Sequence, residues 1–390
     1  MIAKTSALLR VLVRSLTLRA QSAATDRGGP FNKILVLGYG AIGDFIFLMP
    51  ALAALRKAFP KSKIVFLMNR YPVTTDLLPA TGLVDEIWEM DAEKGDRVKM
   101  HDQIRGGRFD AVLLSYATPI SAFSEALLSI PVRVGHTYPV GTKMSIVTGE
   151  YERRTVLNRR IYGTLGENAV ARNLDLVRAL DIDAPIPAES RPRLPETEAA
   201  VNYAAEQIPA GKSWVGIHLG APQSQYGKLW DADSWGRLCR RLTQEYDVGI
   251  VFVGAGEDRP EGVFSGDSCA AKYKKLWGDC GLVESLAVIR RCKLFLASDT
   301  GLAKSSIAMG VPTVTIWGPT DPGELQPPWD EAKHLNIRHE VPCQPCVRLG
   351  MPKDGGLNYT NCGHRNCLTQ LTPDAVFQAI REKYGDLLKG

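Results

Sequence analysis

The sequence lacks any apolar stretch long enough to cross a bilayer. Its 390 residues contain no window of 18 apolar residues free of charge, which excludes a transmembrane helix of ordinary length. It also has little excess charge, because 47 basic and 42 acidic side chains leave a net charge of +5, too modest to indicate nucleic-acid binding. With 45% apolar and 23% charged residues, the composition is typical of a globular protein of two or three domains.

Acidic residues are missing from the first 24 positions, which hold Lys4, Arg10, Arg14 and Arg19 among apolar side chains. Arg10 and Arg14 are four residues apart and therefore share a helix face. Residues 1–30 are predicted to form a basic extension, with three alternatives. The alternatives are an amphipathic helix that lies on an anionic membrane, a leader similar to a transit peptide, and a frayed terminus.

Strands and helices alternate along two halves of the chain. In the first half, apolar runs predict strands at 34–37, 64–67, 86–88, 111–114 and 132–134, and periodic patterns predict helices at 44–59 and 168–180. A proline-rich, apolar-poor segment at 183–195 marks the domain boundary. The second half predicts strands at 214–219, 249–254, 294–298 and 313–317, and helices at 231–246, 282–291, 301–309 and 372–388. This alternation predicts an α/β protein of two doubly wound domains, with a substrate cleft between them.

The turn after the first strand reads Gly-Tyr-Gly-Ala-Ile-Gly-Asp at 38–44. Gly38, Gly40 and Gly43 match the spacing of a dinucleotide site, which would indicate an NAD(P)-dependent oxidoreductase. However, Asp44 places a carboxylate where a pyrophosphate would bind, and no acid follows the second strand to hold a ribose. We therefore interpret the glycines as room for a substrate and Asp44 as a general base. The alternatives are the oxidoreductase site and a structural turn in which Asp44 caps the helix.

Polar segments follow three predicted strands of the second half, where ligands bind in an open parallel sheet. Lys228 offers a cation for a diphosphate, and Glu257 offers an acceptor for ribose hydroxyls. Thr300 and Gly301 open a helix whose N–H groups suit a phosphate. These residues predict a nucleotide-diphosphate site, although Lys228 could also be a surface lysine. His218 is interpreted as a buried residue at a strand end.

The order of these segments resembles the family 9 glycosyltransferases, the ADP-heptose heptosyltransferases of bacterial lipopolysaccharide and glycoprotein assembly. The matching pieces are Lys33–Pro50, Asn168–Asn173, Gly216–Trp230, Asp299–Gly301 with Ala308–Pro312, and Trp317–Pro322. The chain departs from the family at two positions, because Asn168 and Lys304 stand where many members have histidine.

The resemblance implies a GT-B fold with an acceptor-side Rossmann-like domain at 31–185, a donor domain at 196–370, and a helix at 371–390 that crosses back to the first domain. It also implies an inverting transfer of a heptose or similar sugar from ADP-heptose, with Asp44 as the base. The expected donor contacts are Gly43, Gly220, Lys228, Glu257, Asp299, Thr300, Gly301, Leu302 and Lys304.

The acceptor is left open among a lipopolysaccharide core, a surface glycan or glycolipid, and a protein. No Asp-x-Asp motif of the metal-dependent transferases occurs in a suitable place, so we expect no catalytic metal. We expect no nucleic-acid partner, and a cytoplasmic protein in peripheral contact with the inner face of the inner membrane. An inactive carbohydrate-binding relative is the remaining alternative.

Four of the eight cysteines form a cluster with the spacing Cys343-x2-Cys346-x15-Cys362-x4-Cys367. The loop at 341–368 is rich in glycine and poor in apolar residues, so it has little to hold it in place. Paired cysteines at this spacing predict a structural zinc or iron ion bound by four thiolates, with His364 as a substitute ligand. Disulfides and unligated thiols are the alternatives. The other four cysteines, at 239, 269, 280 and 292, are expected to be free thiols.

Overall fold

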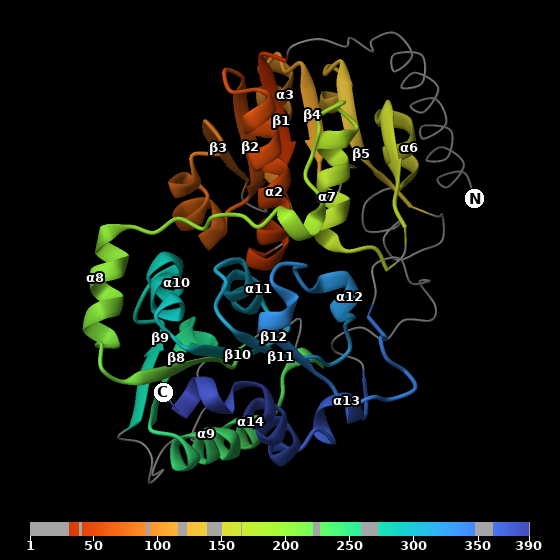
Figure 1. The fold of residues 1–390 in the computed structure, drawn as a ribbon. Helices are drawn as coiled ribbons and strands as arrows, with labels where there is room; N and C mark the ends of the chain where they lie inside the picture. The colour runs from red at the N-terminus through yellow and green to blue at the C-terminus, as the bar shows by residue number, and fades with distance from the viewer. Residues whose placement is uncertain are drawn as a thin grey trace. The chain divides into compact units, whose positions relative to one another are not determined.

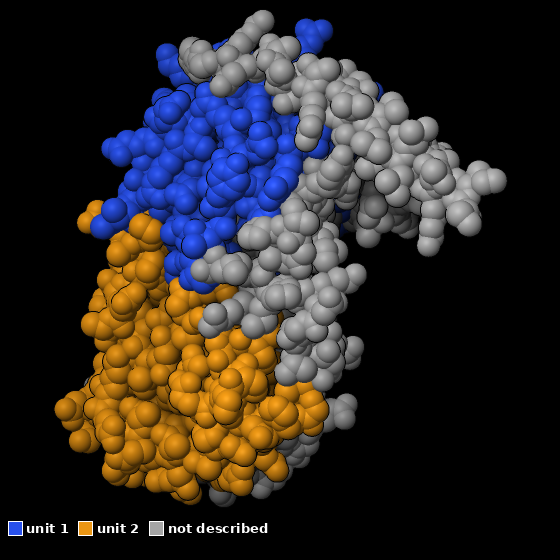
Figure 2. Space-filling model, turned by 90° about the vertical axis from the view of Figure 1, so that its right-hand side faces the viewer, with its two compact units in different colours: residues 1–186, 349–354 blue, residues 187–348, 355–390 orange. Residues whose placement is uncertain are grey.

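The computed structural model describes residues 31–38, 41–90, 94–115, 123–138, 150–164, 166–220, 227–258, 272–347 and 362–389. The chain divides into two compact units, residues 1–186 with 349–354 and residues 187–348 with 355–390 (Figure 2). The division falls between Ile186 and Pro187, inside the proline-rich segment. Residues 1–30 lie outside the described ranges, so the basic extension stays a prediction. Among the helices in those ranges, none has both the length and the apolarity to span a membrane.

The first unit is built on a parallel sheet in the order β3-β2-β1-β4-β5-β6. Its strands are β1 (Lys33–Leu37), β2 (Lys63–Asn69), β3 (Glu86–Met90), β4 (Ala111–Leu114), β5 (Val132–Thr137) and β6 (Arg159–Tyr162). Its helices are α2 (Ile42–Ala58), α3 (Lys94–Gly106), α4 (Ser124–Leu127), α6 (Glu150–Val156) and α7 (Ala169–Arg178), with short turns at Val73–Leu77 and Pro79–Thr81. Helices α2 and α7 lie together in front of the sheet in Figure 1. The core on the other face joins strand residues to α3, α4 and α6.

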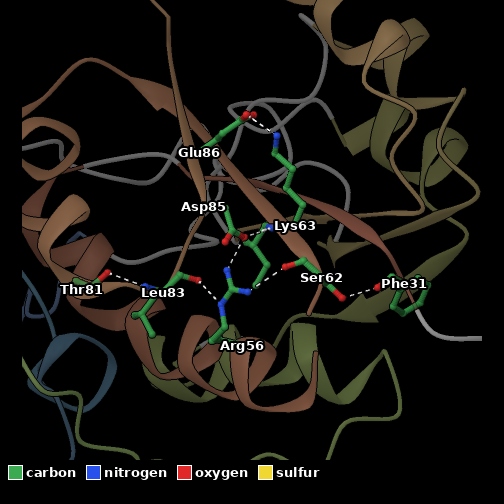
Figure 3. A network of polar contacts seen from close by, with 9 residues as sticks. Phe31, Arg56, Ser62, Lys63, Thr81, Leu83, Asp85 and Glu86 are labelled. Atoms are coloured by element: carbon green, nitrogen blue, oxygen red, sulfur yellow. Dashed lines mark hydrogen bonds and ion pairs between the residues drawn. The ribbon is translucent and has the colours of Figure 1, made fainter. Parts of the chain in front are cut away.

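A polar network ties the amino ends of the first unit's strands together (Figure 3). Arg56, in the last turn of α2, donates to the carbonyls of Ser62 (2.9 Å) and Leu83 (3.3 Å) and to Asp85 (2.6 Å). Asp85 Oδ2 also accepts the N–H of Ile64 at 2.7 Å. One arginine therefore joins the α2–β2 turn to the start of β3. This edge is opposite to the carboxyl ends of the strands, and we interpret the network as structural.

The second unit repeats the architecture with the sheet order β12-β11-β10-β7-β8-β9. Its strands are β7 (Ser213–His218), β8 (Val248–Gly254), β9 (Tyr273–Trp277), β10 (Leu294–Ser298), β11 (Thr313–Ile316) and β12 (His334–Ile337). Its helices are α8 (Glu198–Gln207), α9 (Ala232–Glu245), α10 (Leu282–Arg290), α11 (Gly301–Ala308), α12 (Pro322–Leu325), α13 (Asn366–Thr369) and α14 (Pro373–Lys389), with short turns at Pro187–Glu189, Gly256–Asp258 and Glu331–Lys333. Figure 1 shows α9 and α14 on one face of this sheet, and α10, α11 and α12 on the other.

Both sheets have the strand order of a doubly wound nucleotide-binding domain. Counted from the first strand of each unit, the order is 3-2-1-4-5-6 in both cases. The order reverses between β1 and β4 in the first unit and between β7 and β10 in the second. Ligands bind beyond the carboxyl ends of the strands at such a reversal. The predicted α/β class with two Rossmann-like domains is therefore confirmed.

The last helix, α14, takes part in the core of the second unit. It packs against α9. Phe377, Ile380 and Tyr384 of α14 are buried in the same cluster as strand residues of this sheet. The physical reason is the apolar face of α14, which covers the sheet beside α9. That the segment 371–390 also crosses back to the first domain stays a prediction.

Candidate functional site

A buried carboxylate between two lysines forms the centre of the predicted diphosphate site. Asp299 follows β10, and its Oδ2 lies 2.8 Å from Nζ of Lys228. The other oxygen, Oδ1, forms an ion pair with Lys304 of α11. Thr320, which follows β11, donates its hydroxyl to Oδ2 at 2.8 Å. The site thus joins separate segments at the carboxyl edge of the sheet.

This triad carries more positive than negative charge. Burial by itself would raise the pKa of Asp299, but the ammonium groups of Lys228 and Lys304 hold it far below its usual range. Asp299 is therefore ionised, and one carboxylate faces two ammonium groups. All three side chains are more than nine-tenths buried. Ammonium groups held in such a place, where water screens them poorly, attract an anion strongly.

The N-terminus of α11 lies beside the triad. Thr300 is the N-cap residue, but its side chain makes no capping hydrogen bond to this helix end. The Thr300 hydroxyl instead lies 3.1 Å from Nδ1 of His218, at the end of β7. Gly301 and Leu302 form the first turn, and Lys304 follows on the same helix. The N-terminal N–H groups of α11 and the two lysines therefore favour the same ligand, a phosphate or diphosphate.

His218 is paired with an acid that the sequence did not identify. Its Nε2 lies 3.2 Å from Oδ2 of Asp258, which also accepts the N–H of Ala255 at 2.8 Å. Glu257, the predicted ribose acid, is exposed and lies one residue earlier. The short helical turn at 256–258 turns Asp258 inward and leaves Glu257 outside. The interpretation of His218 as a buried strand-end residue is confirmed, and its pairing with Asp258 is a contact that the sequence did not predict. The role of Glu257 as the ribose acid stays a prediction.

The glycines around Asp258 leave space for its side chain. A Cβ atom at Gly220 would overlap Oδ1 of Asp258. A Cβ atom at Gly254, whose φ is +146°, would lie 2.6 Å from Oδ2 of Asp258 and 2.9 Å from Cδ2 of His218. Gly220 was predicted as a donor contact, and its local role is to admit the Asp258 carboxylate. The absence of side chains at Gly220 and Gly254 therefore leaves the space that the Asp258 carboxylate occupies.

In the first unit, Asp44 lies at the carboxyl edge of the sheet, in the first turn of α2. The helix begins at Ile42, two residues earlier than predicted, so Asp44 is its third residue. Its Oδ2 accepts the N–H of Ala41 at 2.9 Å, which makes it part of a capping box. Gly43 is buried in the same turn, and Gly38 packs against the ring of Phe66. The carboxylate is partly exposed.

The segment Asn168–Asn173 opens α7 next to α2. Asn168, which departs from the family's histidine, is the N-cap and accepts the N–H of Val170 at 3.0 Å. Arg172 is buried in the first turn, and it acts with Arg153 on the fully buried His136 of β5. Burial first, and then these two guanidinium groups, lower the pKa of His136 to about 3. His136 is therefore neutral at physiological pH.

Two of the four clustered cysteines have raised pKa values. Burial and the neighbouring thiols raise the pKa of Cys346, and the same causes raise the pKa of Cys367 to about 11. Cys362 Sγ accepts the N–H of Arg365 at 3.4 Å. All seven cysteines in the described ranges are free thiols, so no disulfide forms among them. Within those ranges no three His, Cys, Asp or Glu side chains are arranged to hold a metal ion. The donor set suits zinc or iron, whereas the described positions do not form a coordination site.

Comparison with known proteins identifies the family. The model of glycosyltransferase family 9 (heptosyltransferase) matches residues 97–354. Lipopolysaccharide heptosyltransferase 2 of Escherichia coli K12 is 23% identical over 89% of this chain and 97% of its own length.

Solved structures of the family share the fold. The structure of E. coli ADP-heptose lps heptosyltransferase II covers 91% of this chain and 98% of its own, with a TM-score of 0.65 and 21% identity. The dodecameric iron-containing heptosyltransferase TibC, in complex with ADP-D-beta-D-heptose, covers 93% of this chain and 78% of its own, with a TM-score of 0.58 and 13% identity. Because the family model spans about two thirds of the chain, this protein belongs to glycosyltransferase family 9 and is a glycosyltransferase of the heptosyltransferase type.

Proposed function

We propose that this glycosyltransferase moves a heptose from ADP-heptose to a hydroxyl group of its acceptor, with inversion at the anomeric carbon. The buried triad Lys228–Asp299–Lys304 is the observation that carries the proposal. A nucleotide sugar presents a diphosphate, and the leaving group gains negative charge as the bond to the sugar breaks. Two ammonium groups and the α11 N-terminus, fixed before the reaction, stabilise that charge in the transition state.

Asp44 is the proposed general base. The acceptor hydroxyl is a weak nucleophile and needs a carboxylate to take its proton as it attacks. Attack on the face opposite the leaving ADP inverts the anomeric configuration. Asp44 is fixed by its hydrogen bond from Ala41, so the helix start holds the carboxylate in one orientation. The role requires an acceptor hydroxyl that reaches both Asp44 and the sugar.

The relatives support a lipopolysaccharide core as the first acceptor to test, because E. coli heptosyltransferase 2 is named for lipopolysaccharide. A surface glycan, a glycolipid and a protein acceptor are the other candidates. The assay that separates them supplies ADP-heptose with each acceptor in turn and measures ADP release and sugar incorporation. An inactive relative would bind ADP and transfer no sugar to any of them.

We expect Lys228→Ala to weaken ADP binding roughly 10- to 100-fold, the scale of one charge-assisted hydrogen bond. The variant removes one of the two cations and leaves Asp299 paired with Lys304. Calorimetric titration with ADP measures the effect. Lys212→Ala is the matched control, because Lys212 is exposed at the opposite end of β7 and should change nothing. Equal ADP affinity in Lys228→Ala and the wild type would contradict the assignment of this site.

We further propose that Cys343, Cys346, Cys362 and Cys367 hold one structural zinc or iron ion. The support is the thiol donor set, the raised pKa values of Cys346 and Cys367, to which burial and then the neighbouring thiols contribute, and the similarity of fold to TibC, an iron-containing heptosyltransferase. A metal would remove the repulsion between neighbouring thiolates and link α13 to the segment after β12.

Elemental analysis of the purified protein should find about one zinc or iron per chain. Cys343→Ser and Cys362→Ser should each lower that content and the melting temperature, because each removes one thiolate ligand. Cys280→Ser is the control, since Cys280 contacts Ser285 far from the cluster in sequence and should keep the metal. Metal-free protein with unchanged melting temperature and activity would show that the four cysteines have another role.

A further inference from the structure

The pair His218 and Asp258 joins the two strands at which the second sheet reverses its order. His218 ends β7 and is paired with Ala297 of the neighbouring strand β10. Thr300 follows β10, so the contact between His218 Nδ1 and the Thr300 hydroxyl spans the reversal, where ligands bind in this fold. His218 and Thr300 are more than nine-tenths buried, and Asp258 has a side chain only 12% exposed.

The direction of the hydrogen bond between His218 and Asp258 follows from the chemistry of the carboxylate. Burial by itself would raise the pKa of Asp258, but hydrogen bonding to His218 and to the Ala255 N–H lowers it, so the carboxylate is ionised and only accepts. His218 Nε2 therefore carries a hydrogen and donates it to Asp258. At the other ring nitrogen, Nδ1 of His218 holds the Thr300 hydroxyl in a hydrogen bond of 3.1 Å. The hydroxyl is thereby held away from the N–H groups that an N-cap threonine ordinarily binds.

We propose that Asp258 and His218 are positioning residues, which keep the Thr300 hydroxyl from capping α11 so that the helix N-terminus is open to the donor diphosphate. Without His218, the hydroxyl can rotate and accept the N–H of Ala303, as threonine does at most helix starts. The capped helix then offers one fewer donor to the phosphate. Gly220 and Gly254 belong to the same arrangement, because a Cβ atom at either position would collide with the Asp258 carboxylate. This inference rests on the proposed function of the site.

A double-mutant cycle on the full-length protein tests the inference, with ADP and inorganic pyrophosphate as probes in calorimetry. His218→Ala should weaken ADP binding roughly five- to tenfold, the scale of one N-cap hydrogen bond. In a Thr300→Val background, which has no hydroxyl, the same substitution should change ADP affinity less than about twofold. Asp258→Ala should behave like His218→Ala in both backgrounds.

His339→Ala is the control, since His339 is only partly buried and its Nε2 lies 2.9 Å from Oε1 of Gln370, after β12 and outside this contact network. Thermal unfolding of each variant without ligand identifies any variant that fails to fold. If His218→Ala fails to fold, Asp258→Ala replaces it in the cycle. An equal loss in both Thr300 backgrounds would overturn the inference, because the histidine would then act without the hydroxyl. If the wild-type protein bound neither ADP nor pyrophosphate, that result would contradict the proposed function itself, on which this inference rests.

Discussion

Replacing Asp44 with asparagine should lower kcat about 100-fold or more, the scale of a positioned general base, while ADP affinity stays near that of the wild type. Asparagine keeps an oxygen that can accept the N–H of Ala41, so the start of α2 is preserved and only the proton acceptor is lost. The variant therefore separates the two roles that the sequence left open, a helix cap and a reactive carboxylate.

Steady-state kinetics with saturating ADP-heptose measures this effect, and calorimetry with ADP checks the donor site. Asp102→Asn, on the exposed side of α3, is the matched control for a lost carboxylate in the same unit. Asp44→Ala should lose the capping hydrogen bond as well, and its melting temperature should fall by more than that of Asp44→Asn. Wild-type turnover in Asp44→Asn, with a lower melting temperature in Asp44→Ala, would leave Asp44 as a structural cap only.

Asp299→Asn should destabilise the protein by about 3–5 kcal/mol, the usual cost of removing one partner from a buried ion pair. Asp299 is the carboxylate between Lys228 and Lys304, and all three are buried. Its loss leaves two ammonium groups close together with no carboxylate between them. Denaturant unfolding, monitored on the second unit's tryptophans, measures the change in the free energy of unfolding.

The double variant Asp299→Asn/Lys304→Met should recover part of this loss, because it removes one of the two buried ammonium groups and keeps an apolar chain of similar length. Asp321→Asn is the control, since Asp321 caps the short helix α12 at the next strand end. Pyrophosphate should raise the melting temperature of Asp299→Asn, because an anion replaces the lost carboxylate. A loss below about 1 kcal/mol in the single variant would show that the lysines do not depend on Asp299.

The strands that the sequence predicted are mostly those in the middle of each sheet. Strands such as β4 and β10 are buried on both faces by helices, so they consist of continuous apolar residues. The sequence did not predict β6, β9 or β12, all of which lie at sheet edges. An edge strand is partly exposed and accepts polar residues, as Arg159, Lys275 and Asn336 show. Only pairing with a neighbouring strand identifies such a segment.

The sequence by itself determined the α/β class, the place of the domain boundary, and the polar segments at strand ends, because each of these depends on residues that are close together along the chain. The tertiary structure decided which of those residues act together. Lys228 and Asp299 are 71 residues apart, and His218 and Thr300 are 82 residues apart, yet each pair is in contact. That Asp258 pairs with His218, 40 residues away, likewise depended on the fold of the whole unit. The strand order brings these residues to one edge of the sheet, and that order is set by packing over the whole unit, which no local pattern records.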